Sequence, residues 1–101
     1  MNERASGMLG ILNRAGLLVF GPSLETMMRK GALLLLAADA SDNTSKNYRC
    51  LAERHHVPIL EIESKSALGA PLGKEELSAV LITQKKAAES FRAKLTKGVH
   101  P

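Results

Sequence analysis

The feature that most constrains the fold of this chain is an unbroken run of apolar residues at positions 32–38, bounded by a glycine and an aspartate. A short apolar run between turn-forming residues fits a strand that is buried on both faces, as in a sheet covered by helices on two sides. Similar runs at 17–20 and 77–83 predict two more strands, and a looser alternation at 59–62 predicts a fourth.

The segments around these strands carry the three- and four-residue spacing of helices that bury one face. Helices are predicted over 3–15, from Ser23 to about 31, from Asp42 or Asn43 up to Pro58, from Ser64 to 68, and over 84–97. Three of them are expected to be capped by Ser23, by Ser64 and by either Asp42 or Asn43, because such side chains accept hydrogen bonds from free backbone N–H groups. Strands and helices that alternate in this way predict a three-layer α/β/α domain with a mostly parallel sheet.

Composition is typical of one ordinary domain. The chain has 101 residues, of which 45% are apolar and 24% charged, and this size suits a single domain. We expect the domain to span residues 1–97 and residues 98–101 to form a disordered tail. Cys50 is the single cysteine, so we expect it to be buried and inert in a cytoplasmic protein. The apolar runs are short, so we expect neither a signal peptide nor a membrane span.

No arrangement of residues points to catalysis or metal binding. His55 and His56 are adjacent, so on a helix their side chains diverge and cannot hold one metal ion together. The glycine-rich stretch at 69–74 lacks the spacing and the Ser or Thr of a phosphate-binding P-loop. Nothing suggests a set of nucleophile, histidine and acid. We therefore expect no enzyme activity, no cofactor, no metal and no small-molecule substrate.

Positive charge is the stronger functional signal. Fourteen Lys and Arg residues against ten Asp and Glu residues give a net charge of +4, which favours polyanionic partners and equally suits a basic domain without one. The last helix carries one acid, Glu89, against five cations: Lys85, Lys86, Arg92, Lys94 and Lys97. These cations would give its outer face a positive field, although a solvated helix also accounts for them.

Two further basic positions lie at predicted helix ends. Arg29 and Lys30 close the helix that follows the first strand, where cations complement the helix dipole without any ligand. Lys65 follows the cap Ser64 at a helix start, where the same dipole disfavours a positive charge. The position of Lys65 therefore indicates a functional role.

Several short motifs follow one another in a fixed order. They are Leu9-Gly10, Asn13-Arg14-Ala15-Gly16, Gly21 at the start of a helix, Asp39-Ala40-Ser41 with Asn43-Thr44, Val57-Pro58, and Ser64-Lys65 with Leu68-Gly69 and Gly73-Lys74. In order and spacing, over residues 7–95, they resemble the kink-turn-binding ribosomal protein superfamily (L-seven-Ae-like), in particular its short bacterial YlxQ branch. The resemblance implies an α/β/α sandwich around a mixed, mostly four-stranded sheet. It also implies a protein without catalysis that binds structured RNA, such as a kink-turn or ribosomal RNA. We expect this protein to be a cytoplasmic monomer.

The resemblance further implies where RNA would bind. In such relatives the start of the helix after the first strand faces the sheared G·A pairs of a kink-turn, and a loop after a later strand covers an extruded base. The corresponding residues here are Gly21, Pro22, Ser23, Arg29 and Lys30 in the first segment and Ile62, Ser64 and Lys65 in the second. A helix N-terminus attracts phosphate, and a short apolar residue can pack on an unstacked base.

The chain departs from these relatives at three positions. Where RNA-binding relatives carry Asn, Glu and Lys, it carries Ser23, Leu24 and Met27. Neither Leu24 nor Met27 can hydrogen-bond to a base edge, so we expect recognition to depend on RNA shape and phosphate contacts. The replacements also leave open an alternative function, a protein-interaction or scaffold module that keeps the fold and has lost kink-turn recognition.

Overall fold

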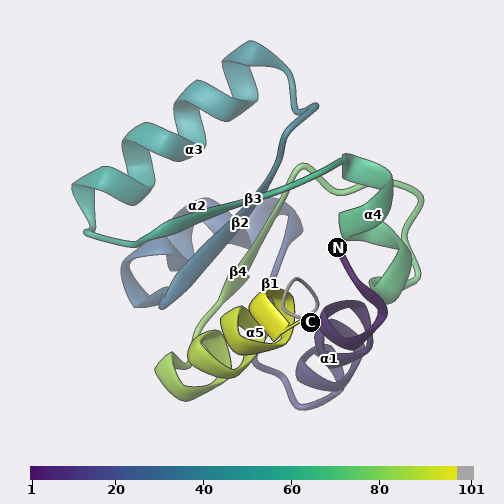
Figure 1. The fold of residues 1–101 in the computed structure, drawn as a ribbon. Helices are drawn as coiled ribbons and strands as arrows, with labels where there is room; N and C mark the ends of the chain where they lie inside the picture. The colour runs from purple at the N-terminus through teal and green to yellow at the C-terminus, as the bar shows by residue number, and fades with distance from the viewer. Residues whose placement is uncertain (98–101) are drawn as a thin grey trace.

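The computed structural model describes residues 1–97, which form a four-stranded sheet with helices on both faces (Figure 1). The strands are β1 (Leu18–Val19), β2 (Leu33–Ala37), β3 (Ile59–Ile62) and β4 (Ala79–Ile82). The helices are α1 (Glu3–Arg14), α2 (Leu24–Met27), α3 (Asp42–Arg54), α4 (Lys65–Gly69) and α5 (Lys85–Lys97). Short 3-10 turns, η1 (Gly21–Ser23) and η2 (Met28–Lys30), flank α2, and η3 (Ala70–Leu72) follows α4. The predicted tail, 98–101, lies outside the described residues.

The sheet is mixed, with the strand order β1-β4-β2-β3. β2 and β3 run parallel, with Leu34 aligned to Ile59. β4 lies between β1 and β2 and is antiparallel to both, so Leu81 stands beside Val19 on one side and Leu34 on the other. The expectation of a mostly parallel sheet is therefore wrong, because alternating helices and strands do not determine which strands become neighbours. The mixed four-stranded sheet that the resemblance implies is confirmed.

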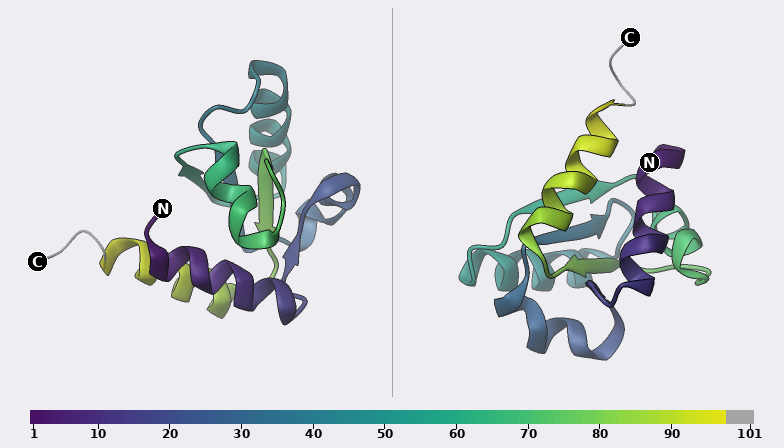
Figure 2. Two further views of the ribbon diagram at one scale, coloured as in Figure 1. Left: turned by 90° about the vertical axis from the view of Figure 1, so that its right-hand side faces the viewer. Right: turned by 90° about the horizontal axis from the view of Figure 1, so that it is seen from below.

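Side chains alternate along each strand, so the two faces of the sheet have separate cores. Leu33 and Leu35 pack with Phe91 of α5 and with apolar residues of α1 and α4. Leu34 and Leu36 pack on the other face against α2 and α3. Figure 2 allows both layers of helices to be followed from two sides. The three-layer α/β/α sandwich is confirmed.

Two serines cap helices at the same edge of the sheet. Ser64 caps α4 as predicted, because its Oγ accepts a hydrogen bond from the N–H of Ala67 at 3.0 Å. At α3 the cap is Ser41, whose Oγ lies 3.2 Å from the donating N–H of Thr44. Asp42 and Asn43, the predicted caps of that helix, lie within its first turn instead.

The segment between β1 and β2 is a series of short turns rather than one helix. The series begins at Gly21, which has a φ of +83°, and continues with Pro22, a residue suited to a first helical position. Ser23 already has a helical backbone and its side chain accepts no capping bond, so the predicted cap at Ser23 is wrong. Gly31 ends the series at a point where any Cβ would collide with the side chain of Leu81.

The thiol of Cys50 is exposed on α3, so the prediction of a buried cysteine is wrong. The inner side of α3 is formed by Tyr48, Leu51 and Ala52, which pack against β2 and α2. Successive residues of a helix point about 100° apart, so a position two after Tyr48 and two before Ala52 faces solvent.

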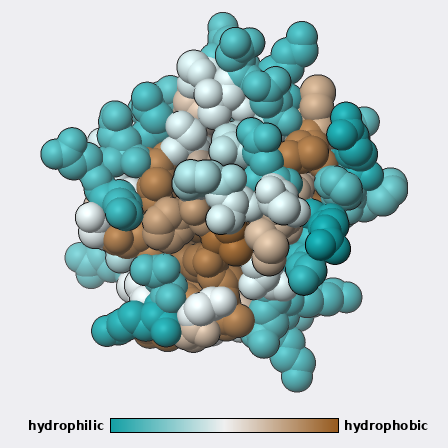
Figure 3. Space-filling view, turned by 180° about the vertical axis from the view of Figure 1, so that it is seen from behind, coloured by the Kyte–Doolittle hydropathy of each residue, from teal (hydrophilic) through white to brown (hydrophobic). Residues whose placement is uncertain are grey.

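An apolar area occupies the middle of the face seen in Figure 3, the side on which α2 and the edge strand β1 lie. Half-buried apolar residues come from these elements and their connection: Leu18, Val19, Phe20 and Met27. The middle of this face therefore offers little to a phosphate.

Candidate nucleic-acid interface

Strand direction brings several predicted RNA-binding residues to one edge of the sheet. β1, β2 and β3 point the same way, because β4 is antiparallel to β1 and β2 while β3 is parallel to β2. The chain therefore leaves all three strands at one edge, on the right in Figure 1. We call this the loop edge and define it as the three connections Gly21–Ser23, 38–41 and 63–65.

Hydrogen bonds join two of these connections. The N–H of Ala38 donates to the carbonyl of Ile62 at 2.7 Å. The N–H of Lys65 donates to Asp39 Oδ1, also at 2.7 Å, and the carbonyl of Lys65 accepts from the N–H of Leu77 at 3.1 Å. The backbone of Lys65 is thus fixed between the end of β2 and the start of β4.

The connection Gly21–Ser23 lies at the far end of the same edge. β1 and β3 are the outer strands of the sheet, so at least three strand spacings, or about 14 Å, separate their ends. All of Gly21–Ser23 is exposed, whereas Ser64 and Lys65 are half-buried. The loop edge therefore offers two separate contact points to a ligand.

Three predicted site residues lie elsewhere. The side chain of Ile62 is 2% exposed and belongs to the core, so the predicted packing of Ile62 on a base does not fit this structure. The signal was present in the sequence, since Glu61 and Glu63 on either side are exposed and alternation turns Ile62 inward. Arg29 and Lys30 end η2 just before β2 begins, which places them at the opposite edge of the sheet.

The positions that depart from RNA-binding relatives are largely buried. Leu24 is fully buried, and the half-buried Met27 packs against the same core. α2 itself has four residues, and so few aligned peptide dipoles give only a weak field at the helix start. The expected attraction of phosphate to this helix N-terminus is correspondingly small.

Charge at the loop edge is predominantly negative. Carboxylates on it or beside it are those of Asp39, Asp42, Glu63, Glu75 and Glu76, and the ammonium groups are those of Lys65, Lys74 and the N-terminal Met1. Glu63 is paired with the N-terminal amine of Met1. A phosphate here is attracted by few positive charges, so contacts at this edge depend on backbone donors, hydroxyls and shape.

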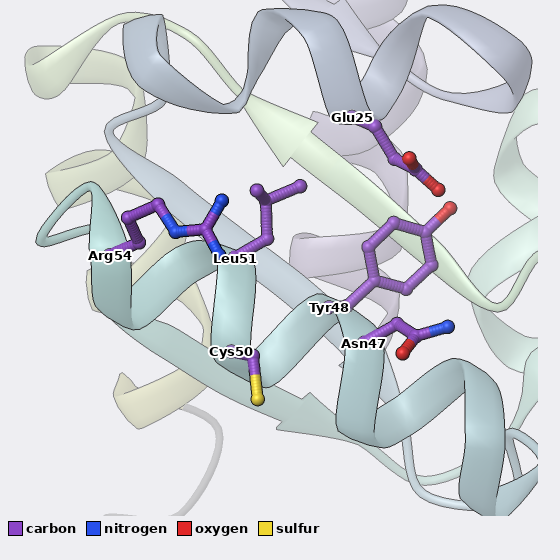
Figure 4. Close-up of a pocket in the computed structure, with 6 residues that line it drawn as sticks. All are labelled: Glu25, Asn47, Tyr48, Cys50, Leu51 and Arg54. Atoms are coloured by element: carbon purple, nitrogen blue, oxygen red, sulfur yellow. The ribbon is translucent and has the colours of Figure 1, made fainter.

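A small pocket of about 230 Å³ opens between α2 and α3 (Figure 4). In Figure 4 the hydroxyl of Tyr48 points toward the carboxylate of Glu25. Burial raises the pKa of Tyr48 above its ordinary value of 10.0, and the negative charge of Glu25 raises it further. The phenol is therefore protonated at neutral pH, and it presents a donor to this pocket.

Within residues 1–97, no three His, Cys, Asp or Glu side chains are grouped closely enough to hold a metal ion. In the same part of the chain, no helix has the length and apolar character needed to cross a membrane.

Comparison with known proteins identifies the family. Residues 23–92 match the model of the ribosomal protein L7Ae/L30e/S12e/Gadd45 family. The chain belongs to this family. Two relatives are both named RNA-binding protein YlxQ. The protein from Bacillus subtilis (strain 168) is 37% identical over 79 residues, which cover 75% of this chain and 79% of the relative. The protein from Enterococcus faecium is 29% identical over 75 residues, covering 71% and 73%.

The fold itself is also found in a solved structure. It is described as a protein with unknown function from Bacillus halodurans C, and it superposes with a TM-score of 0.83 over 94% of this chain and 99% of that chain, at 19% identity. The resemblance to the YlxQ branch of the family is confirmed by the two relatives. Both relatives are named for RNA binding, which agrees with the expectation that the chain is not an enzyme.

Proposed function

We propose that this chain binds structured RNA. The observation that carries the proposal is its similarity to two proteins named for RNA binding, each aligned over more than 70% of this chain. The net charge of +4 supports a polyanionic partner. A kink-turn or a segment of ribosomal RNA is the proposed ligand, and a cytoplasmic monomer is the proposed state of the protein.

The loop edge is the proposed surface for the folded part of the RNA. Gly21, Pro22 and Ser23 are exposed at one end, and Ser64 and Lys65 stand at the other. Separate contact points at least about 14 Å apart suit an RNA that is recognised by its shape. The buried Ile62 supports this surface from the core. Arg29 and Lys30 contact RNA phosphates at the opposite edge of the sheet.

Recognition of a kink-turn is proposed to be weaker here than in relatives that carry Asn, Glu and Lys. Each good polar contact to a base edge contributes about 1–3 kcal/mol. Leu24 and Met27 supply none, and Leu24 is fully buried. The remaining affinity then comes chiefly from phosphates and is sensitive to salt.

Binding to two RNAs tests this function. One RNA contains a kink-turn, and in the other its sheared G·A pairs are replaced by Watson–Crick pairs. We expect both affinities to fall steeply between about 50 and 200 mM salt, with a modest preference for the kink-turn. If neither RNA binds at the lower salt, or if affinity does not respond to salt, the proposal is wrong.

A protein-interaction module on the same fold is the second candidate. Two observations favour it: the apolar area over α2 and β1 in Figure 3, and the excess of carboxylates at the loop edge. Exposed apolar patches are typical of protein-binding surfaces. This candidate predicts that the folded chain has no measurable affinity for structured RNA even at low salt.

A further inference from the structure

A second set of connections meets at the edge of the sheet opposite the loop edge. There β2 and β3 begin and β4 ends. The end of η2, the end of α3 and the start of α5 lie on the left in Figure 1 and again on the left in the right-hand view of Figure 2. The N–H of Ala32 donates to the carbonyl of Ile82 at 2.7 Å, and this bond ties the entry of β2 to the exit of β4.

Positive charge gathers on these connections. Lys30 comes two residues before Ala32, and Lys85 comes three residues after Ile82. We call the basic edge the four cations Arg29, Lys30, Lys85 and Lys86, all of which are exposed. Among residues 1–97 none of these four forms an ion pair. Arg54 ends α3 at the same edge, but it lines a pocket together with Glu25 and is therefore not included in the basic edge.

Helix dipoles account for the positions of only two of these four cations. Arg29 and Lys30 close a series of turns whose last carbonyl groups favour cations. Lys85 and Lys86 open α5, a helix of 13 residues, and the start of a helix disfavours positive charge. Adjacent ammonium groups also repel each other. Glu89, one helical turn on, offsets part of this unfavourable charge. Two adjacent lysines at a helix start nevertheless fit a role in binding a negative ligand better than a role in stability.

The arrangement fits a phosphate backbone better than it fits bases. Arg29 and Lys30 precede β2, and Lys85 and Lys86 follow β4. These two strands are neighbours, with backbones about 5 Å apart, but the two pairs of cations lie in helix layers on opposite faces of the sheet. Bases stack most strongly on Phe, Tyr and Trp side chains. Phe20, Tyr48 and Phe91, the residues of these types in the chain, lie in none of these connections, although His55 and His56 lie between α3 and β3. Flexible Lys and Arg side chains hold phosphate without reading sequence.

We propose that the basic edge is a second RNA surface, which holds the phosphodiester backbone of a segment other than the one at the loop edge. The proposal rests on the RNA-binding function proposed above. The two surfaces lie at opposite ends of the strands in a molecule of 35 × 25 × 25 Å. An RNA that contacts both must extend past the domain, so the protein would clamp two segments of one folded RNA.

Two variants of equal net charge test the proposal. One replaces the basic edge, R29Q/K30Q/K85Q/K86Q, and the control replaces four other exposed cations, R4Q/R14Q/K46Q/K94Q. The probe is a kink-turn RNA with long helical arms. We expect the basic-edge variant to bind it at least tenfold more weakly and to lower the slope of log affinity against log salt by about 3, since each phosphate contact contributes roughly 0.7–0.9. The control should change both quantities much less.

The outcomes separate this proposal from the proposed function. If wild type binds and the two variants match each other in affinity and slope, the basic edge is not an RNA surface, while RNA binding stands. If wild type binds no RNA at low salt, both proposals are wrong. Melting temperatures exclude unfolding as the cause of a loss. We expect the basic-edge variant to melt close to wild type, because relief of the repulsion between Lys85 and Lys86 opposes the loss of the favourable dipole interactions of Arg29 and Lys30.

Discussion

The carboxylate of Asp39 accepts a hydrogen bond from the backbone N–H of Lys65 at 2.7 Å, between residues 26 positions apart in the chain. The bond connects the exit of β2 to the first residue of α4. An ionised acceptor makes such a bond stronger than a neutral one. The loop edge therefore has one rigid part, around Lys65, and a separate exposed part at Gly21–Ser23.

Replacement of Asp39 should loosen this rigid part. We expect Asp39→Ala to lower the free energy of unfolding by about 1 kcal/mol, because the N–H of Lys65 loses its acceptor. Asp39→Asn retains an acceptor oxygen and should cost less. Urea unfolding measures the stability, and hydrogen exchange at the Lys65 amide reports the bond itself. Exchange that is equally slow in Asp39→Ala and in wild type would show that the bond does not fix the loop.

Lys65→Ala should affect binding and leave stability nearly unchanged. Lys65 forms no ion pair within the described chain, so its loss should change the free energy of unfolding by no more than about 0.5 kcal/mol. Structured RNA at low salt should bind more weakly. Leu35→Ala is the opposite control, because Leu35 is fully buried and its truncation should cost about 2–5 kcal/mol. Unchanged RNA affinity in Lys65→Ala would remove Lys65 from the interface.

The two substitutions that introduce the Glu and Lys of RNA-binding relatives should have opposite effects on this protein. Leu24→Glu places a carboxylate where the side chain is fully buried. We expect it to destabilise the fold by more than the roughly 2–5 kcal/mol of a Leu→Ala truncation, because the charge also loses its hydration. Met27→Lys, at a half-buried position, should be tolerated and should strengthen RNA binding. Thermal melting of the two single variants checks this, and a stable Leu24→Glu protein would contradict the buried position.

Stability should fall at alkaline pH through Tyr48. Its pKa is raised in the folded state, by burial and then by Glu25, so the folded protein holds the phenolic proton more tightly than the unfolded chain does. The resulting stabilisation is complete below the ordinary value of 10.0 and is lost as pH rises through the folded-state pKa. Tyr48→Phe removes the titrating group.

Urea unfolding of wild type and Tyr48→Phe below and above pH 10 tests this expectation. The variant should lose less stability than wild type over the interval, while other titrating groups affect both proteins alike. Tyr48 is the single tyrosine, so the absorbance of its tyrosinate reports the folded-state pKa directly. A midpoint at the ordinary value would show that neither burial nor Glu25 affects the phenol.

Apolar runs were sufficient to locate the strands, because a buried strand needs an apolar surface wherever it pairs. They did not determine strand order, which depends on contacts such as Leu18 with Ile82 between distant segments. Helix caps show the same limit. Ser41, Asp42 and Asn43 are all good capping residues, and Ser41 is the cap because the helical backbone begins at Asp42.

The candidate site was predictable where it follows a strand end. Ser64 and Lys65 lie at the loop edge because β3 ends beside them. Arg29 and Lys30 were predicted in one segment with Gly21, yet the turns between β1 and β2 cross the whole sheet and carry them to the far edge. Sequence proximity therefore concealed a separation that only the strand directions reveal.

The central position of β4 constrains the order in which the chain can fold. The N–H of Thr83 donates to the carbonyl of Leu17 at 3.0 Å, across 66 residues, and within residues 1–97 β1 pairs with no strand other than β4. During synthesis β1 therefore remains without a partner until β4 has left the ribosome. Contacts between such distant segments slow folding. The early chain also leaves exposed the edge of β2 and the apolar side chains that later pack against β4. A nascent chain that ends before residue 79 should consequently be prone to aggregation.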